Sequence, residues 1–84
     1  MHSWKPLPLR SIIIEELLKH KGVMTDTELF NNIYRVYDIS ISDFNKELMN
    51  LEIEGIIHVS PMTKNKRKVE VLRPEQRYLG VGED

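Results

Sequence analysis

The chain of 84 residues contains no cysteine, which excludes disulfide bridges, thiolate metal sites and thiol nucleophiles. Its longest apolar run, Ile12–Ile14, is far too short to span a membrane, and the N-terminus lacks the apolar stretch of a signal peptide. We therefore expect a cytoplasmic protein without a membrane association. The histidines at positions 2, 20 and 58 lack the spacing of metal ligands, so we expect no zinc site.

Patterns typical of enzymes are also missing. The four glycines are scattered and form no phosphate-binding loop. Glu15 and Glu16 are neighbours in a predicted helix, so their carboxylates face different directions and do not form a catalytic pair. The serines and histidines are not arranged along the sequence with a buried acidic residue as in a catalytic triad. We therefore expect no enzymatic activity, no cofactor and no small-molecule ligand.

The composition is that of a globular protein, with 40% hydrophobic and 30% charged residues. The length predicts a single domain with one core. The net charge is only -1, but the charge is unevenly placed. Residues 61–77 carry six basic and two acidic side chains, whereas residues 1–60 carry six basic and nine acidic ones. The basic segment is therefore the natural candidate for contact with a polyanion.

Apolar residues at three-to-four spacing predict a first helix from Pro8 or Leu9 to Lys21. Proline is tolerated at the first helical position, because its missing N–H has no helical partner there. Leu18 belongs to the predicted apolar face of this helix. Gly22 is expected to end the helix in a left-handed conformation.

Capping residues predict two further helices. The second begins at Thr25, followed three residues later by a glutamate, and is expected to end near Tyr37 or Asp38. Its tyrosines, Tyr34 and Tyr37, have helical spacing and are predicted to lie in the core. The third helix begins at Ser40 and ends at Gly55. The short connection between these two helices predicts a steep crossing angle, as in a helix-turn-helix.

After Gly55 the apolar period changes to two, which predicts a strand that Pro61 ends. Residues 62–66 are a predicted turn, and residues 67–72 alternate again as a second strand. Together they predict an antiparallel hairpin that packs on the helices. The expected organisation is an extended leader over residues 1–7, a domain over 8–74 and a C-terminal extension over 75–84.

The segment from Leu48 to Ile57, LMNLEIEGII, resembles the Leu-x-x-Leu-Glu-x-x-Gly pattern with two following apolar residues of the winged helix-turn-helix superfamily. The resemblance extends over residues 8–72 and is greatest to small stand-alone winged-helix proteins of archaea. It implies an α+β fold, in which a three-helix bundle with a helix-turn-helix precedes a two-stranded β-hairpin wing. It also implies a protein that binds double-stranded DNA and regulates transcription.

In this superfamily the third helix enters the major groove and the wing lies on the backbone or the minor groove. Carried over to this chain, the contacts on the third helix would be Ser42, Asn45, Lys46, Met49 and Asn50. The contacts of the wing with phosphates would be Lys64, Lys66, Arg67 and Lys68. The resemblance further implies a homodimer, and its candidate surfaces are the first helix, the leader with Trp4 and Leu7, and the extension with Tyr78 and Leu79.

Two features of the third helix depart from this pattern. An acidic flank of Asp43, Glu47 and Glu54 predicts only modest affinity for DNA. Met49 and Ile53 form a predicted exposed apolar pair, which is more typical of a protein contact. The alternatives are therefore a winged helix that binds a protein partner in transcription or replication machinery, and a winged helix associated with RNA or the ribosome.

Overall fold

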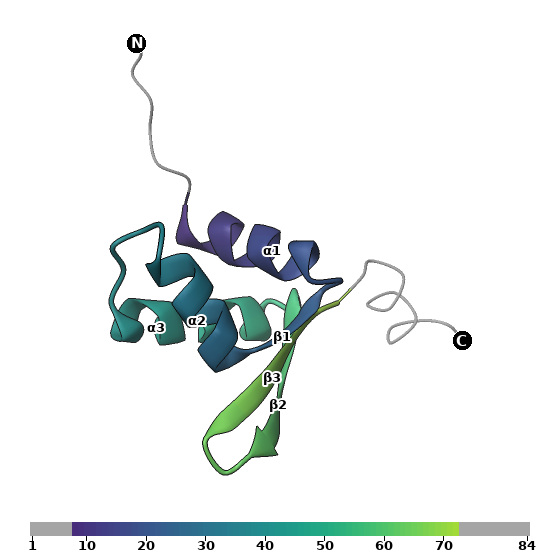
Figure 1. Cartoon of the computed structure of the whole chain (residues 1–84). Helices are drawn as coiled ribbons and strands as arrows, with labels where there is room; N and C mark the ends of the chain where they lie inside the picture. Colours follow the sequence, from purple (N-terminus) through teal and green to yellow (C-terminus); the bar gives the residue numbers. More distant parts are fainter. Residues whose placement is uncertain (1–7, 73–84) are drawn as a thin grey trace, which may run out of the picture.

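A computed structural model describes residues 8–72 as three helices and a small antiparallel sheet (Figure 1). The elements follow one another as α1 (Leu9–Lys19), β1 (Val23–Thr25), α2 (Asp26–Tyr34), α3 (Ile41–Ile53), β2 (Ile57–Thr63) and β3 (Lys66–Val71). The predicted α+β class, the three helices and the antiparallel hairpin are confirmed. The predicted leader and extension, with the dimer residues Trp4, Leu7, Tyr78 and Leu79, lie outside the described residues.

The capping residues begin the second and third helices as predicted. The Thr25 hydroxyl oxygen accepts a hydrogen bond from the backbone N–H of Glu28 at 3.1 Å. The Ser40 hydroxyl oxygen accepts one from the backbone N–H of Asp43 at 3.0 Å. Each bond satisfies an N–H group that has no partner inside its helix, so these two positions fix where α2 and α3 begin.

Two helix ends differ from the prediction. Helix α1 ends at Lys19 rather than Lys21, and Lys21 itself adopts a left-handed conformation with φ of 64°, ahead of Gly22 at 87°. Helix α2 ends at Tyr34 rather than near Tyr37 or Asp38. The side chains of Tyr34 and Tyr37 are 54% and 37% exposed, so their predicted place in the core is wrong. Beyond Tyr34 the chain turns toward α3, so the helical spacing no longer describes it.

The sheet has three strands in the order β1-β3-β2, whereas a two-stranded hairpin was predicted. The additional strand, β1, is only three residues long and pairs with β3 through Val23–Glu70, Met24–Val69 and Thr25–Lys68. Strand β2 also continues through Pro61 to Thr63, with an irregular register there. Proline is tolerated because β2 is an edge strand, where a missing backbone N–H removes no bond to a further strand.

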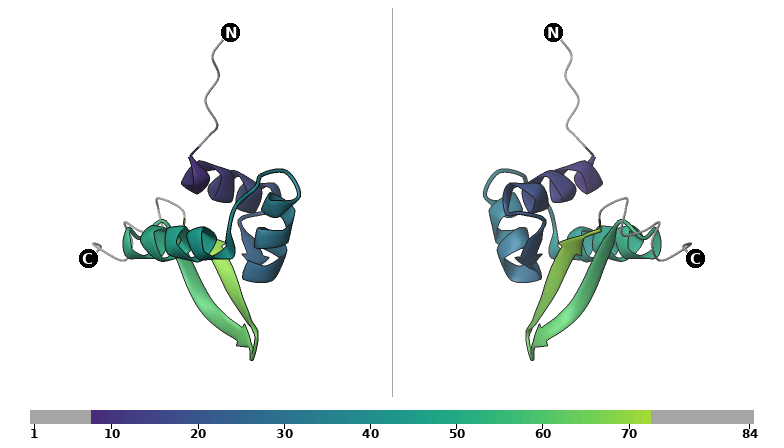
Figure 2. Two further views of the ribbon diagram at one scale, coloured as in Figure 1. Left: turned by 90° about the vertical axis from the view of Figure 1, so that its left-hand side faces the viewer. Right: turned by 90° about the vertical axis from the view of Figure 1, so that its right-hand side faces the viewer.

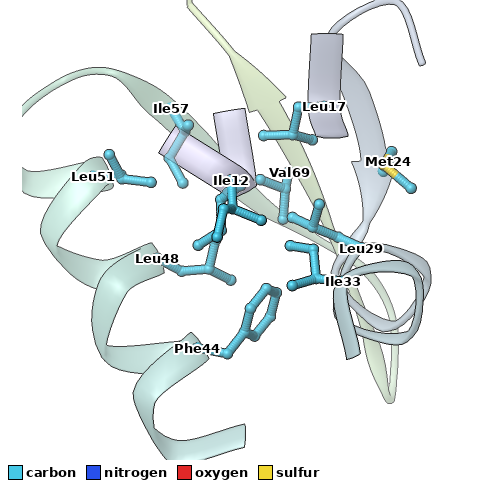
Figure 3. Close-up of a cluster of buried hydrophobic side chains, with 11 residues drawn as sticks. Ile12, Leu17, Met24, Leu29, Ile33, Phe44, Leu48, Leu51, Ile57 and Val69 are labelled. Carbon is cyan, nitrogen blue, oxygen red and sulfur yellow. The ribbon is translucent and has the colours of Figure 1, made fainter. Parts of the chain in front are cut away.

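A single core joins the helices to the sheet (Figure 3). Phe44, Leu48 and Leu51 project from one side of α3 into this core, as their spacing predicts. Leu18 does not join it: its side chain is 59% exposed, so its predicted place on the apolar face of α1 is wrong. The buried residues are Ile12, Ile13, Leu17, Met24, Leu29, Ile33, Phe44, Leu48, Leu51, Ile57 and Val69.

The helices pack on one side of the sheet, and the β2–β3 hairpin extends beyond them (Figures 1 and 2). Helix α3 lies at the front of the left view of Figure 2, with no other described element in front of it. The molecule therefore presents the outer side of one helix together with a projecting hairpin.

Candidate nucleic-acid interface

The outer face of α3 carries the five residues of this helix that were predicted to contact DNA. Because Phe44, Leu48 and Leu51 point into the core, the opposite side of the helix is left to solvent. All five predicted residues are exposed on α3: Ser42, Asn45, Lys46, Met49 and Asn50. They offer two amides, one hydroxyl and one ammonium group, which are the donors and acceptors that read base edges.

The four predicted wing residues do not form one equivalent set. Lys64 lies at the turn between β2 and β3, and Lys66 begins β3. Side chains alternate along a strand, and Val69 is buried against the helices. Arg67 therefore shares the helix side of the sheet with Val69, whereas Lys66 and Lys68 lie on its other side. Lys64, Lys66 and Arg67 are exposed, and Lys68 is half-buried.

Arg67 connects the hairpin to both α2 and α3. Its Nε donates to Oδ2 of Asp26 at 3.0 Å, and its backbone N–H donates to the other carboxylate oxygen, Oδ1, at 3.1 Å. Its Nη2 donates to Oδ1 of Asn45 at 3.4 Å. Two predicted contact residues, Asn45 and Arg67, are thus brought together from positions 22 residues apart in the chain. The other polar residues predicted on α3 make no such contact with the hairpin among the described residues.

Asp26 is the site residue that the sequence did not indicate. Asp26 follows β1 directly. Thr25 pairs with Lys68 on the antiparallel strand β3, so Asp26, one residue after Thr25, lies beside Arg67, one residue before Lys68. Burial acts to raise the pKa of Asp26, but the hydrogen bonds and charge of Arg67 outweigh it, and the pKa lies below its ordinary value. Asp26 is therefore ionised at neutral pH and forms an ion pair with Arg67.

A hollow of about 190 Å³ lies beside this ion pair, between the first turns of α2 and α3 and the hairpin. Its floor is apolar and its rim carries the amide and guanidinium groups described above. The residues that line it are Asp26, Thr27, Phe30, Asn31, Ile41, Phe44, Asn45 and Arg67. Phe30 and Phe44 both line the hollow and meet edge to face, with ring centroids 5.2 Å apart.

A residue of α1, Arg10, forms ion pairs with two of the three carboxylates on the predicted acidic flank of α3. Arg10 reaches Glu54 at 2.7 Å through Nη2 and Glu47 at 3.3 Å through Nε. Hydrogen bonds to Glu54 and Glu47 raise the pKa of Arg10 above its ordinary value. Of the three acidic residues, only Asp43 has no ion pair within the described part of the chain. Arg10 carries one positive charge, so the flank keeps a net negative charge, and modest affinity for DNA stays a prediction.

An exposed apolar pair also lies on α3, as predicted. Met49 and Ile53 are 60% and 77% exposed and are four residues apart, so they are neighbours on one side of the helix. Leu18 is the large exposed apolar residue of α1, the described part of the predicted dimer surface. These side chains leave apolar area in water that a partner could cover.

Over residues 8–72 the structure contains no group of three metal-ligating side chains. The same residues include no helix long and apolar enough to cross a membrane. The fold and its outer surface define a small α+β module that presents a polar helix face beside a basic hairpin. Comparison of the chain with known protein families, with curated proteins and with solved structures finds no match.

Proposed function

We propose that this protein is a winged-helix protein that binds double-stranded DNA, most simply as a transcription regulator. In this proposal α3 enters the major groove, and the β2–β3 hairpin acts as the wing on the adjacent backbone. The observation that carries the proposal is the bond between Arg67 and Asn45, because it joins the basic hairpin to the outer face of α3 in one continuous surface.

The dimensions of α3 are compatible with this role. A helix of 13 residues is about 20 Å long and, with side chains, about 10–12 Å wide. The major groove of B-DNA is about 12 Å wide and admits such a helix. Asn50 and Lys46 then face base edges, where an amide can pair with adenine and an ammonium group with guanine.

The charge of the surface supports phosphate contacts by the hairpin. Lys64, Lys66 and Lys68 take part in no ion pair of the described residues, and Arg10 offsets one of the two negative charges of Glu47 and Glu54 on α3. Each phosphate that a lysine neutralises releases counterions and adds about 0.9 to the slope of log affinity against log salt concentration. The hairpin should therefore supply most of the affinity that does not depend on sequence.

A salt-series anisotropy titration of a labelled duplex tests the proposal. Lys64→Ala combined with Lys66→Ala should weaken binding alike on every duplex and lower the salt slope by about 1.8. The matched control is Lys19→Ala combined with Arg35→Ala, which removes the same charge from the ends of α1 and α2. An equal loss in the control would show that only the net charge matters. A parent protein that binds no duplex at low salt would refute the proposal.

The exposure of Met49 and Ile53 favours a second candidate function, a contact with a protein partner through α3. The two functions predict different effects of the substitution Ile53→Ser on binding. In the DNA complex Ile53 lies near the end of α3 and away from the Asn45–Arg67 contact, so the substitution should leave duplex affinity unchanged within about twofold. A protein contact centred on this pair would instead be lost, since apolar side chains at the centre of an interface carry most of its energy.

A further inference from the structure

The guanidinium group of Arg67 is bound at two of its five N–H donors. Nε–H, on the lateral edge of the planar group, is bound to Asp26, and one N–H of Nη2 is bound to Asn45. Nη1 has no partner among the described residues, and the side chain of Arg67 is 47% exposed. The terminal edge, formed by Nη1 and Nη2, therefore keeps donors for a further acceptor.

The ion pair with Asp26 changes which kind of DNA contact suits Arg67. A phosphate contact gains its free energy from the release of counterions, which requires a net positive charge. The carboxylate of Asp26, only 3.0 Å from Nε, offsets that charge. A guanine base is neutral, so a contact with it depends less on net charge, and it requires that two N–H groups meet two acceptors at once. The bond between Nε–H and Asp26 favours the fixed orientation that this requires.

We propose that Arg67 reads a guanine through its terminal edge, and that Asp26 and Asn45 are positioning residues that set the orientation of its guanidinium plane. Guanine O6 and N7 are two adjacent acceptors in the major groove, and they match the terminal edge of an arginine. Arg67 lies against Asn45 of α3, so this guanine borders the bases that α3 contacts. The inference rests on the proposed function, and it assigns to Arg67 a specificity that a phosphate contact lacks.

The same geometry assigns a second consequence to Asp26. Because it offsets the charge of Arg67, Asp26 lowers affinity for DNA of any sequence while it raises discrimination between sequences. Asp26→Asn should therefore strengthen binding to random duplexes and increase the salt slope by up to about one unit. The same substitution should weaken the preference for the correct site. A residue that merely repelled DNA would change affinity without changing the preference.

The experiment begins with a preferred duplex selected by the parent protein from a randomised pool. Each guanine of that duplex is then replaced in turn by 7-deazaguanine, which lacks the N7 acceptor. We expect one position at which the replacement weakens the parent by about fivefold, the lower end of the discrimination of a bidentate base contact, because O6 remains as an acceptor. At that position the replacement should weaken Arg67→Met and Asp26→Asn by less than about twofold. Arg67→Met has no donors at position 67, and Asp26→Asn no longer holds the donors of Arg67 in one orientation.

Asp43→Asn is the matched control, since it removes a first-turn carboxylate from α3 as Asp26→Asn does from α2. It should raise affinity for all duplexes and keep the full sensitivity to 7-deazaguanine. Arg67→Met tests the inference without altering Asp26, in case Asp26→Asn fails to fold. A DNA-free measurement completes the set: the Arg67 Nε–H should give a slowly exchanging NMR signal in the parent that Asp26→Asn removes.

The outcomes separate the inference from the function on which it rests. If the parent binds duplex DNA but no guanine shows the expected sensitivity, or if Arg67→Met retains it, the base contact is refuted and the proposed function stands. A sensitivity that Asp26→Asn leaves intact would refute the positioning role. A parent without the slowly exchanging Nε–H signal would contradict the geometry itself. A parent that binds no duplex refutes the proposed function and this inference together.

Discussion

Leu48 and Ile53 offer a test of how α3 is placed, because both lie on this helix and differ almost completely in burial. Leu48 sits among the core residues (Figure 3). Its exposed fraction is 2%, whereas that of Ile53 is 77%. The same kind of truncation, Leu48→Ala and Ile53→Ala, should therefore have very different effects on the free energy of unfolding. If α3 were rotated about its axis, the two effects would exchange.

The expected loss for Leu48→Ala follows from its burial. The substitution removes the equivalent of three methylene groups, each with a transfer free energy of about 0.8 kcal/mol, so transfer alone gives roughly 2.4 kcal/mol. The cavity left between α3 and the other helices adds to this, for a total of about 2–5 kcal/mol. The whole domain should be stable by only about 3–10 kcal/mol, so the variant would be close to unfolding.

Ile53→Ala should change the free energy of unfolding by no more than about 0.5 kcal/mol, because the side chain is already in water. Alanine also has the higher helix propensity, which offsets part of any loss. Urea denaturation followed by circular dichroism measures both variants against the parent, with similar slopes showing that the unfolded states are comparable. A loss at Leu48 that matched the loss at Ile53 would refute the packing of α3 described above.

Three further predictions concern helix ends and charge. Thr25→Ala and Ser40→Ala should each destabilise the protein by about 0.5–2 kcal/mol, measured by urea denaturation, because each leaves a helix N–H group without its partner. Gly55→Ala should lower the free energy of unfolding by about 1–2 kcal/mol, because φ is 78° at this position. Lys21→Gly should raise it by up to about 1 kcal/mol, because Lys21 has a left-handed φ of 64°. Thermal melting measures both changes. The pKa of Asp26 is lowered from 3.8, so its ionised form stabilises the folded state above that pH. This contribution is lost as the pH falls through the lower pKa of the folded state. Asp26→Asn should remove this pH dependence, as acid denaturation can show.

Each of these three predictions would be contradicted by one outcome. Unchanged denaturation midpoints in both cap variants would mean that α2 and α3 begin elsewhere. A Gly55→Ala variant as stable as the parent would contradict the left-handed turn, since no neighbouring atom lies within 4 Å of the added methyl group to explain a loss by crowding. Parallel acid-unfolding curves for the parent and Asp26→Asn would show that Arg67 does not stabilise the carboxylate in solution.

Local sequence determined the helices of this protein and most of its core. A hydroxyl side chain at Thr25 or Ser40 satisfies an N–H group within its own first turn, so the start of α2 or α3 needs no distant partner. Gly55 similarly ends α3, because only glycine adopts a left-handed conformation without strain. Apolar spacing then fixed which side of α3 is buried, and with it the exposed set that includes Asn45 and Lys46.

Tertiary contacts decided the strand β1 and the end of α2, which the local sequence pattern does not predict. Residues Val23–Thr25 are too few to show the period of a strand, and they form β1 only because β3 offers them unpaired backbone groups. Tyr34 continues a helical pattern, yet α2 stops there and the chain turns toward α3. In both places the partner that decides the conformation lies elsewhere in the chain.

The charged contacts of the candidate interface were decided in the same way. Arg10 lies 37 and 44 residues from the two glutamates that it pairs with, and Asp26 lies 41 residues from Arg67. No spacing rule relates such positions, because the fold alone sets the distance between them. The sequence by itself thus determined which side chains of α3 and the hairpin are available, and the pairing of β1 with β3 decided that one of them, Arg67, is held by Asp26 against Asn45.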